Sequence, residues 1–303
     1  MARKKNTHIL APRYWPAWLG LAILWLSGKL LSYRLALGLG SLLGRLVYHL
    51  ARRRRHIAEV NLRLCFPEQD EAQRKQLLEA HFEALGIGLI LTGFAWWASD
   101  AKLRSLLQVE GLEHLEQCLN QGRGALLLGS HFTDLEISGR LFILCHPTAV
   151  MYRRHENPVI EWAFSRNRQK NFVAAIPRED IRMTLRTLKN NHPIWYATDQ
   201  SFKGPGSTLV PFFGVPASTN SGTSRLAKIS RAPVLTFNCI RLPGSQGFRL
   251  IFKPPLQDFP SDDVQSDASR INALIEEAVR LAPEQYLWTH RRFKKRKGLP
   301  DPY

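Results

Sequence analysis

From residue 108 onward, short apolar segments alternate with amphipathic ones, and this alternation limits the possible folds more than any other feature of the sequence. Strands are predicted at 125–129, 148–153, 172–177 and 193–200, with helices between the later ones. Two later strands, 233–242 and 248–256, are expected to pair, and a helix within 267–286 closes the chain. Strands that alternate with helices align in parallel and are covered on both faces. We therefore predict an α/β fold whose mixed, largely parallel sheet is flanked by helices.

The N-terminal region is the most apolar part of the chain and predicts a membrane-anchoring helix. The charge-free stretch 14–28 is shorter than the roughly 20 residues that cross a bilayer. It reaches that length through Tyr33 if the Lys29 side chain extends to the membrane surface. Three tryptophans in this stretch are typical of the membrane–water interface: Trp15, Trp18 and Trp25.

A second apolar segment follows at 34–50, but it contains Arg34 and Arg45. Arginines within an apolar helix favour a position along the membrane surface rather than across the bilayer. We thus divide the chain into an N-terminal anchor with its interfacial helix, 1–50, and one α/β domain, 51–303. Single-pass and monotopic insertion both remain open, because positive charges flank the segment on both sides.

The charge of the chain points to an anionic partner. The net charge is +17 at pH 7, and the basic residues are clustered. The clusters are Arg3 to Lys5, Arg52 to Arg55, and Arg291 to Lys297. No zinc-finger spacing, leucine zipper or aromatic-studded basic strand accompanies them, so an anionic membrane surface is favoured over nucleic acid. Four scattered cysteines without metal-ligand spacing predict reduced thiols and no metal site.

The stretch "LLLGSHFTDLE" (126–136) places a histidine and two acids just beyond a buried strand. Ligands of open α/β sheets bind beyond the carboxyl ends of the strands, where His131 lies. Glu136 follows five residues later, and the two side chains meet only if His131 sits in the turn before a helix. A carboxylate that orients an imidazole lets the second ring nitrogen take a proton from a hydroxyl. Asp134 competes for this role, or is simply an acid that the helix dipole favours.

The motifs of two large hydrolase classes are missing. The sequence contains no GxSxG serine elbow and no HExxH pair, which disfavours a serine hydrolase and a zinc peptidase. Direct transfer to a hydroxyl of the acceptor needs only a base and the group that orients it. We therefore expect His131 as general base, with Glu136 as its partner and with no metal or organic cofactor.

The segment "HFTDLE" resembles the HX4(D/E) motif of the glycerolipid-type acyltransferases. Along nearly its whole length the chain resembles the lipid A biosynthesis lauroyl acyltransferase family. Matching stretches include "RRRRHIAEVNLRLCFPE", "WYATDQ", "VPFFGVPASTNSGTSRLA" and "APEQYLWTHRRFKKRKGLPDPY". The resemblance implies an O-acyltransferase of lipopolysaccharide biosynthesis at the cytoplasmic face of the cell inner membrane. It also implies acyl carrier protein as donor of laurate or a similar chain, and a Kdo-bearing lipid A precursor as acceptor.

The resemblance also assigns roles to individual residues. It makes His131 the base and Glu136 its acidic partner, and it links Arg168 and Asp199 to activity as substrate-binding residues. A guanidinium suits phosphate or sugar-acid oxygens. The basic run Arg291 to Lys297 is then expected to dock the membrane or the acidic carrier protein. The alternatives are an acyltransferase for another lipid, such as a glycerol phosphate or a glycolipid, and a non-catalytic basic protein that binds membrane or nucleic acid.

Overall fold

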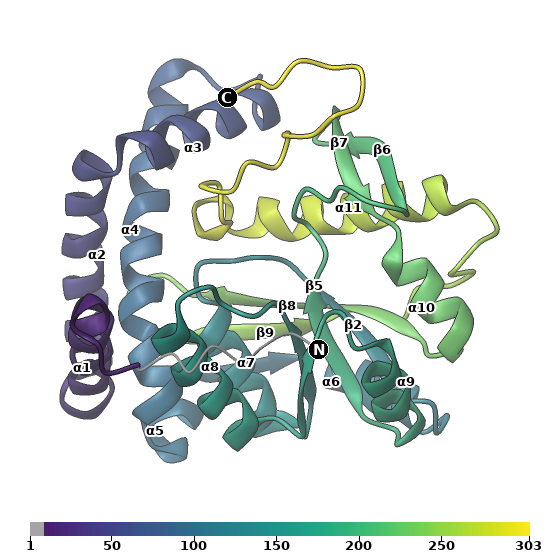
Figure 1. Ribbon diagram of the computed structural model, residues 1–303, viewed down its shortest axis with the longest axis horizontal. Helices are drawn as coiled ribbons and strands as arrows, with labels where there is room; N and C mark the ends of the chain where they lie inside the picture. The colour runs from purple at the N-terminus through teal and green to yellow at the C-terminus, as the bar shows by residue number, and fades with distance from the viewer. Residues whose placement is uncertain (1–8) are drawn as a thin grey trace.

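A seven-stranded sheet forms the centre of the protein, in the order β1-β9-β8-β2-β5-β3-β4 (Figure 1). The computed structural model describes residues 9–303, so the predicted basic residues Arg3 to Lys5 lie outside the described residues. The strands are β1 (Leu107–Glu110), β2 (Ala125–Gly129), β3 (Ala149–Tyr152), β4 (Ala174–Pro177), β5 (Pro193–Ala197), β8 (Val234–Arg241) and β9 (Phe248–Phe252). All neighbouring strands are parallel except the β8–β9 pair. The predicted α/β fold with a mixed, largely parallel sheet is therefore confirmed.

Two hydrophobic cores cover the two faces of the sheet, because successive residues of a strand point to opposite faces. In β2, Leu126 and Leu128 enter one core, while Ala125 and Leu127 enter the other. The first core receives residues of α9 (Ile181–Lys189), α10 (Gly222–Ser230) and α11 (Val264–Leu281). The second receives residues of α6 (Leu112–Leu119), α7 (Leu135–Cys145) and α8 (Pro158–Asn171), and α5 (Asp100–Arg104) adds Leu103 to it. A separate hairpin of β6 (Ser207–Phe212) and β7 (Val215–Asn220) packs against α11.

Helices α1 to α4 form one side of the molecule (Figure 1). They are α1 (Trp15–Leu30), α2 (Tyr33–Leu50), α3 (Arg52–Cys65) and α4 (Glu71–Trp97). The long α4 is the helix on which α1 and α2 pack. Small residues allow the close approach: a side chain at Gly40 or Gly44 of α2 would overlap the backbone of α4. Residues 9–50 are thus packed against α4, which also contributes to both cores.

The predicted membrane-spanning helix through Tyr33 is shorter in the structure, and the second helix begins at Tyr33 instead of following it. Helix α1 ends at Leu30, Leu31 is extended, and the Ser32 side chain caps α2 by accepting a bond from the Leu35 amide. The 16 residues of α1 measure about 24 Å at 1.5 Å per residue, short of a bilayer core of roughly 30 Å. Among the described residues, the one helix with the length and composition to cross a membrane is α4, and 61% of its apolar window is buried.

The outer faces of α1 and α2 carry large apolar side chains that nothing in residues 9–303 covers. On α2 the exposed side chains are leucines that recur three or four residues apart, about one helical turn, on the side away from the buried Gly40 and Gly44. We call them the α2 leucine stripe: Leu35, Leu39, Leu42, Leu46 and Leu50, each at least 48% exposed. On α1, Trp15, Leu19, Ile23 and Leu30 are also at least half exposed. Exposed apolar surface of this extent marks an interaction site, since isolated soluble proteins rarely show it.

Candidate active site

His131 lies in the turn after β2, and its partner is Asp199, which follows the neighbouring strand β5. The imidazole Nδ1 lies 2.6 Å from Oδ1 of Asp199, and the backbone amide of His131 donates to Oδ2 at 3.0 Å. Strands β2 and β5 are adjacent and parallel, so residues 68 apart in sequence meet at one edge of the sheet. Because a carboxylate only accepts, the proton sits on Nδ1 and leaves Nε2 unprotonated in the neutral ring.

The electrostatics of the pair suit a general base. Burial alone would lower the pKa of His131, but the charge and hydrogen bond of Asp199 outweigh it and raise the pKa above its ordinary value. Burial would raise the pKa of Asp199, yet His131 and a hydrogen bond from Tyr286 bring it to about 2. Asp199 therefore stays ionised while His131 takes up and releases a proton. The side chain of Asp199 is 1% exposed and that of His131 25%, so only the histidine is open to a substrate.

A C-terminal segment runs beside the histidine turn and holds it in place. The 3-10 helix η2 (Pro283–Gln285) leads into this segment. The amide of Leu287 donates to the His131 carbonyl at 2.9 Å, and the amide of Thr133 donates to the Gln285 carbonyl at 2.8 Å. Phe132 forms an isolated antiparallel bridge with Tyr286. Tyr286 thus reaches Asp199 from a segment far away in the sequence, and no local spacing could have revealed it.

Glu136 occupies the first turn of α7 and faces a different set of residues. It forms a short ion pair with Arg168 of α8 and accepts a hydrogen bond from Trp96 of α4 at 3.0 Å. The Arg168 guanidinium lies over the rings of Phe164 and Tyr152, at 5.0 and 5.2 Å from their centroids. The side chains of Glu136 and Arg168 are 14% and 9% exposed. This second pair joins three helices into a rigid unit.

The expected contact between His131 and Glu136 is therefore not formed. Within residues 9–303, no hydrogen bond or ion pair joins them, because the first turn of α7 directs Glu136 toward α8 and α4. Asp199, which was expected among the substrate-binding residues, takes the position of the orienting acid. Arg168, also expected to bind substrate, is engaged by Glu136. The participation of the four residues in a reaction stays a prediction.

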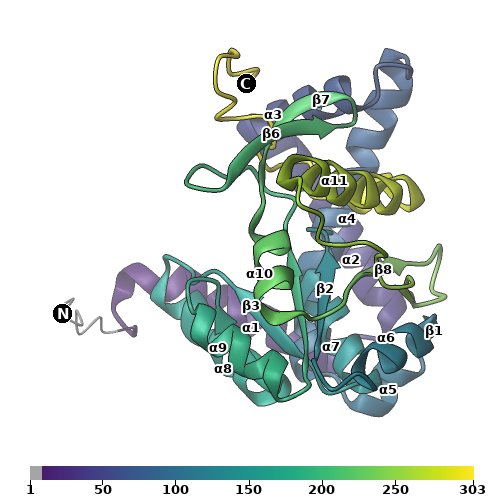
Figure 2. The same cartoon turned by 90° about the vertical axis from the view of Figure 1, so that its right-hand side faces the viewer.

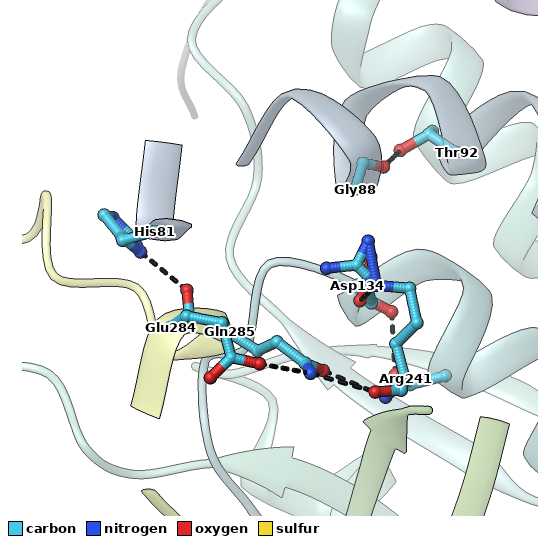
Figure 3. A network of polar contacts seen from close by, with 8 residues as sticks. His81, Gly88, Thr92, Asp134, Arg241, Glu284 and Gln285 are labelled. Carbon is cyan, nitrogen blue, oxygen red and sulfur yellow. Dashed lines mark hydrogen bonds and ion pairs between the residues drawn. The ribbon is translucent and has the colours of Figure 1, made fainter. Parts of the chain in front are cut away.

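Asp134 is the buried end of a polar network that fixes the start of α7 (Figure 3). It is 2% exposed, and its Oδ2 lies 3.5 Å from Nε of Arg241 on β8. Gln285 makes two bonds to the backbone of Arg241, at 2.9 and 3.0 Å. His81 of α4 lies 3.1 Å from the Glu284 carbonyl and must donate to it. Asp134 thus links the start of α7 to β8, while Gln285 links β8 to η2 and His81 links η2 to α4.

Helix α4 approaches the histidine turn closely at Gly88. A Cβ atom at this position would overlap the carbonyl group of Thr133, so only glycine fits between helix and turn. The Gly88 carbonyl in turn accepts a bond from Thr92 at 3.1 Å (Figure 3). The apolar, glycine-rich end of α4 therefore allows the helix to pack directly against the turn that carries His131 and to support it.

The C-terminal basic run divides into buried and exposed residues. Arg292 is 3% exposed and donates to Ser218, Thr219 and Asn272 at 2.8 to 3.3 Å. The prediction that the whole run forms a docking surface is wrong for Arg292, because its guanidinium joins β7 to α11 inside the protein. Lys294 is half-buried, and its pKa is lowered by burial and by neighbouring cations that include Arg153.

His290 is a second histidine near the pair, and the sequence did not single it out. Its pKa falls to about 4, first because it is buried and then because Lys294 lies nearby, although Asp199 opposes this. Its backbone carbonyl accepts a bond from Asn61 of α3 at 2.8 Å. No group of three His, Cys, Asp or Glu side chains that could hold a metal ion occurs in the described part of the chain.

A comparison with known proteins shows which family the chain matches. A family model described as bacterial lipid A biosynthesis acyltransferase matches residues 2–295. The chain belongs to the bacterial lipid A biosynthesis acyltransferases. The resemblance found in the sequence is thereby confirmed.

Individual relatives of this acyltransferase family match almost end to end. The chain is 38% identical over 294 residues to the lipid A biosynthesis palmitoleoyltransferase of Escherichia coli (strain K12), covering 97% of this chain and 95% of the relative. It is 38% identical over 302 residues to the lipid A biosynthesis lauroyltransferase of the same strain, covering 99% and 98%. A lipid A biosynthesis acyltransferase of Haemophilus influenzae is 35% identical over 299 residues, covering 97% and 95%.

Proposed function

We propose that this acyltransferase moves a fatty acyl chain from acyl carrier protein to a hydroxyl on a primary acyl chain of a Kdo-bearing lipid A precursor, as a step of lipopolysaccharide biosynthesis. The observation that carries the proposal is the His131–Asp199 pair. It provides an oriented, partly exposed imidazole at the carboxyl edge of the sheet, in a chain of the lipid A acyltransferase family.

In the proposed reaction, Nε2 of His131 takes the proton from the acceptor hydroxyl. The oxygen attacks the thioester carbonyl carbon, and the tetrahedral intermediate collapses by breaking the carbon–sulfur bond. The imidazolium returns its proton to the departing sulfur, so that an ester and a free thiol result. Asp199 keeps the proton on Nδ1 and stabilises the positive charge of the imidazolium.

The Glu136–Arg168 pair has a positioning role in this proposal. Both side chains are nearly buried and already paired, and Trp96 bonds the second oxygen of Glu136. The pair fixes the first turn of α7, and with it the turn that carries His131. Misplacing reacting groups by about 1 Å can cost roughly 10²-fold in rate, so the pair can be essential without touching the reacting atoms.

We propose that the exposed apolar faces of α1 and α2 seat the protein on the cytoplasmic leaflet of the inner membrane. The α2 leucine stripe supports insertion along the surface, since α1 is too short to span. The predicted anchor, residues 1–50, would act as two surface helices. Replacing Leu35, Leu39 and Leu42 by serine should reduce flotation with lipid vesicles, whereas serine at the exposed Ile229 and Leu281 should not.

The direct test of the function is product analysis. The purified protein, in detergent-lipid micelles, is given lauroyl–acyl carrier protein and a tetra-acylated lipid A precursor with or without Kdo, and products are analysed by mass spectrometry. We expect one laurate to be added to a primary acyl chain of the Kdo-bearing acceptor. A competition with palmitoleoyl–acyl carrier protein tests the chain length, because the relatives named for laurate and palmitoleate are equally identical to this chain.

Two results would contradict the proposal. One is transfer to a glycerol phosphate in preference to every lipid A precursor, which would change the acceptor. The other is equal product formation by a folded His131→Ala protein, which would remove the proposed base.

A further inference from the structure

Helix α9 presents a row of cations that the proposed chemistry does not use. Arg182, Arg186 and Lys189 are exposed, and their spacing of four and three residues places them on one side of the helix. We call these three residues the α9 cationic face. The nearby acids are already engaged: Asp180 caps α9 by accepting from the Met183 amide, and Glu179 pairs with Arg178. In residues 9–303, no carboxylate pairs with any member of the face.

Two hollows adjoin the α9 cationic face, and both combine apolar lining with arginines. One, of about 440 Å³, lies between α9 and the edge strand β4, and Val173, Met183 and Arg186 are among its lining residues. The second, of about 710 Å³, is lined by residues that include Arg153, Ile181 and Arg182. Val173 and Ile181 are 46% and 45% exposed. Apolar side chains framed by like charges are typical of surfaces that bind a protein of opposite charge.

The surface also stands in a definite relation to His131. Strands β2, β5, β3 and β4 are successive neighbours and parallel, so the residues after each of them lie along one edge of the sheet. His131 follows β2, Arg153 follows β3, and α9 begins shortly after β4. At about 4.8 Å per strand, the end of β4 is roughly 14 Å from the end of β2. A partner on α9 would need a flexible arm of at least about this length to bring a bound group to His131, because the estimate reaches only the start of the helix.

Helix α9, which carries the α9 cationic face, lies far from α1 and α2. In Figure 1, α1 and α2 form one side of the molecule and α9 lies at the opposite side. Figure 2 shows α9 toward the viewer, with α1 and α2 behind the sheet. A bilayer that covers the α2 leucine stripe would thus leave α9 in water. This arrangement favours a soluble acidic partner over an anionic lipid.

We propose that the α9 cationic face, with its two hollows, is the docking site for an acidic carrier protein, which extends its acyl thioester along the sheet edge to His131. This inference rests on the proposed function, because it names the surface that receives the donor. The positive charges attract the acidic protein, and the hollows accept apolar side chains from it.

The test compares the wild type with two triple variants of equal charge. The first, Arg182→Gln/Arg186→Gln/Lys189→Gln, neutralises the α9 cationic face. The matched control is neutralised at three exposed cations on other elements, which have no side-chain hydrogen bond or ion pair within residues 9–303: Lys75→Gln/Arg104→Gln/Arg249→Gln. Binding of fluorescently labelled acyl carrier protein is measured by anisotropy, which needs no turnover. Steady-state kinetics then use lauroyl–acyl carrier protein and, separately, lauroyl-pantetheine, which has no acidic protein.

We expect the α9 variant to bind the carrier protein roughly tenfold more weakly than the wild type and the control, as removal of a few exposed attractive charges predicts. The KM for lauroyl–acyl carrier protein should rise by a similar factor, while kcat and the use of lauroyl-pantetheine stay unchanged. Salt raised from about 0.1 M to about 1 M should abolish the difference, because the screening length falls from about 10 Å to about 3 Å.

Equal carrier-protein binding by all three proteins would overturn the docking site. A variant that instead loses binding to vesicles of anionic phospholipid, or to RNA, would assign the face to that partner and would also overturn it. If the wild type turns over neither thioester, the proposed function fails. The anisotropy comparison still decides whether α9 is an acidic-protein site in that case.

Discussion

Two acid–base pairs lie on either side of the turn that joins β2 to α7, and they differ in what is left free. In the His131–Asp199 pair, the carboxylate is buried and the histidine is one-quarter exposed, with its second nitrogen available. In the Glu136–Arg168 pair, both members are nearly buried and both are satisfied by each other and by aromatic neighbours. The difference lies in which atom remains free: the proposed function assigns the reaction to the pair with an open imidazole nitrogen and a supporting role to the pair in which every charged group is engaged.

The largest effect is expected at His131. His131→Ala removes the only atom in the two pairs that is placed to accept a proton, and general-base loss costs about 10²- to 10⁴-fold. We expect a fall in kcat near the upper end of that range, with the protein still folded and membrane-bound. The measurement is single-turnover acyl transfer, with near-wild-type circular dichroism and vesicle flotation as controls. Wild-type turnover by the His131→Ala protein would show that the two pairs do not differ in function as proposed.

A somewhat smaller loss is expected for Asp199→Asn. The amide keeps the shape of the side chain but removes the charge that stabilises the imidazolium, and its NH2 group can favour the wrong tautomer. We expect kcat to fall about 10³-fold, with KM for the acceptor nearly unchanged. Tyr286→Phe, which removes only the hydrogen bond to Asp199, should lower kcat by less. If KM rises instead and kcat holds, Asp199 binds substrate as the sequence suggested.

The next largest loss of activity is expected for Glu136→Gln, which should act by disturbing the structure around the turn that carries His131. It leaves the buried Arg168 without its counter-charge, a change that costs about 3–5 kcal/mol when a buried pair is broken. We expect a lower melting temperature together with a rate loss of about 10²-fold from misplacement of the turn. The double variant Glu136→Gln/Arg168→Met should recover most of the stability, because no unpaired charge remains. A stable single variant would show that the pair is not the support described here.

The sequence predicted the sheet and the position of His131 well, because both depend on local patterns. A run such as Ala125–Gly129 is apolar on both faces, and strands of that kind are buried in parallel sheets. The partner of His131 could not be predicted in the same way. Local spacing favours Glu136, whereas Asp199 is brought close only by the pairing of β2 with β5.

The charge pattern of the sequence predicted an anionic partner, but it did not show which of the basic residues are buried. The run at the C-terminus suggested a solvated surface, yet Arg292 is buried, because acceptors from β7 and α11 surround it. The break between the two N-terminal helices was predicted after Tyr33, but it falls at Leu31 and Ser32, and Ser32 is a residue type that often caps a helix. The burial of Arg292 depends on tertiary contacts, and the end of α1 depends on a single turn. Average composition reveals neither.

The pH dependence of kcat/KM tests most directly whether Asp199, and not Glu136, sets the protonation of His131, the proposed general base. With His131 as the base, transfer needs the unprotonated imidazole, so activity should rise with pH through the pKa of that residue, which Asp199 raises against the effect of burial. In Asp199→Asn the charge that raises the pKa of His131 is removed, while the burial that lowers it remains. The acid limb of the pH profile should therefore move to lower pH. In Glu136→Gln the limb should stay at the wild-type position despite the lower rate. A limb that moves in Glu136→Gln and stays in Asp199→Asn would contradict the account.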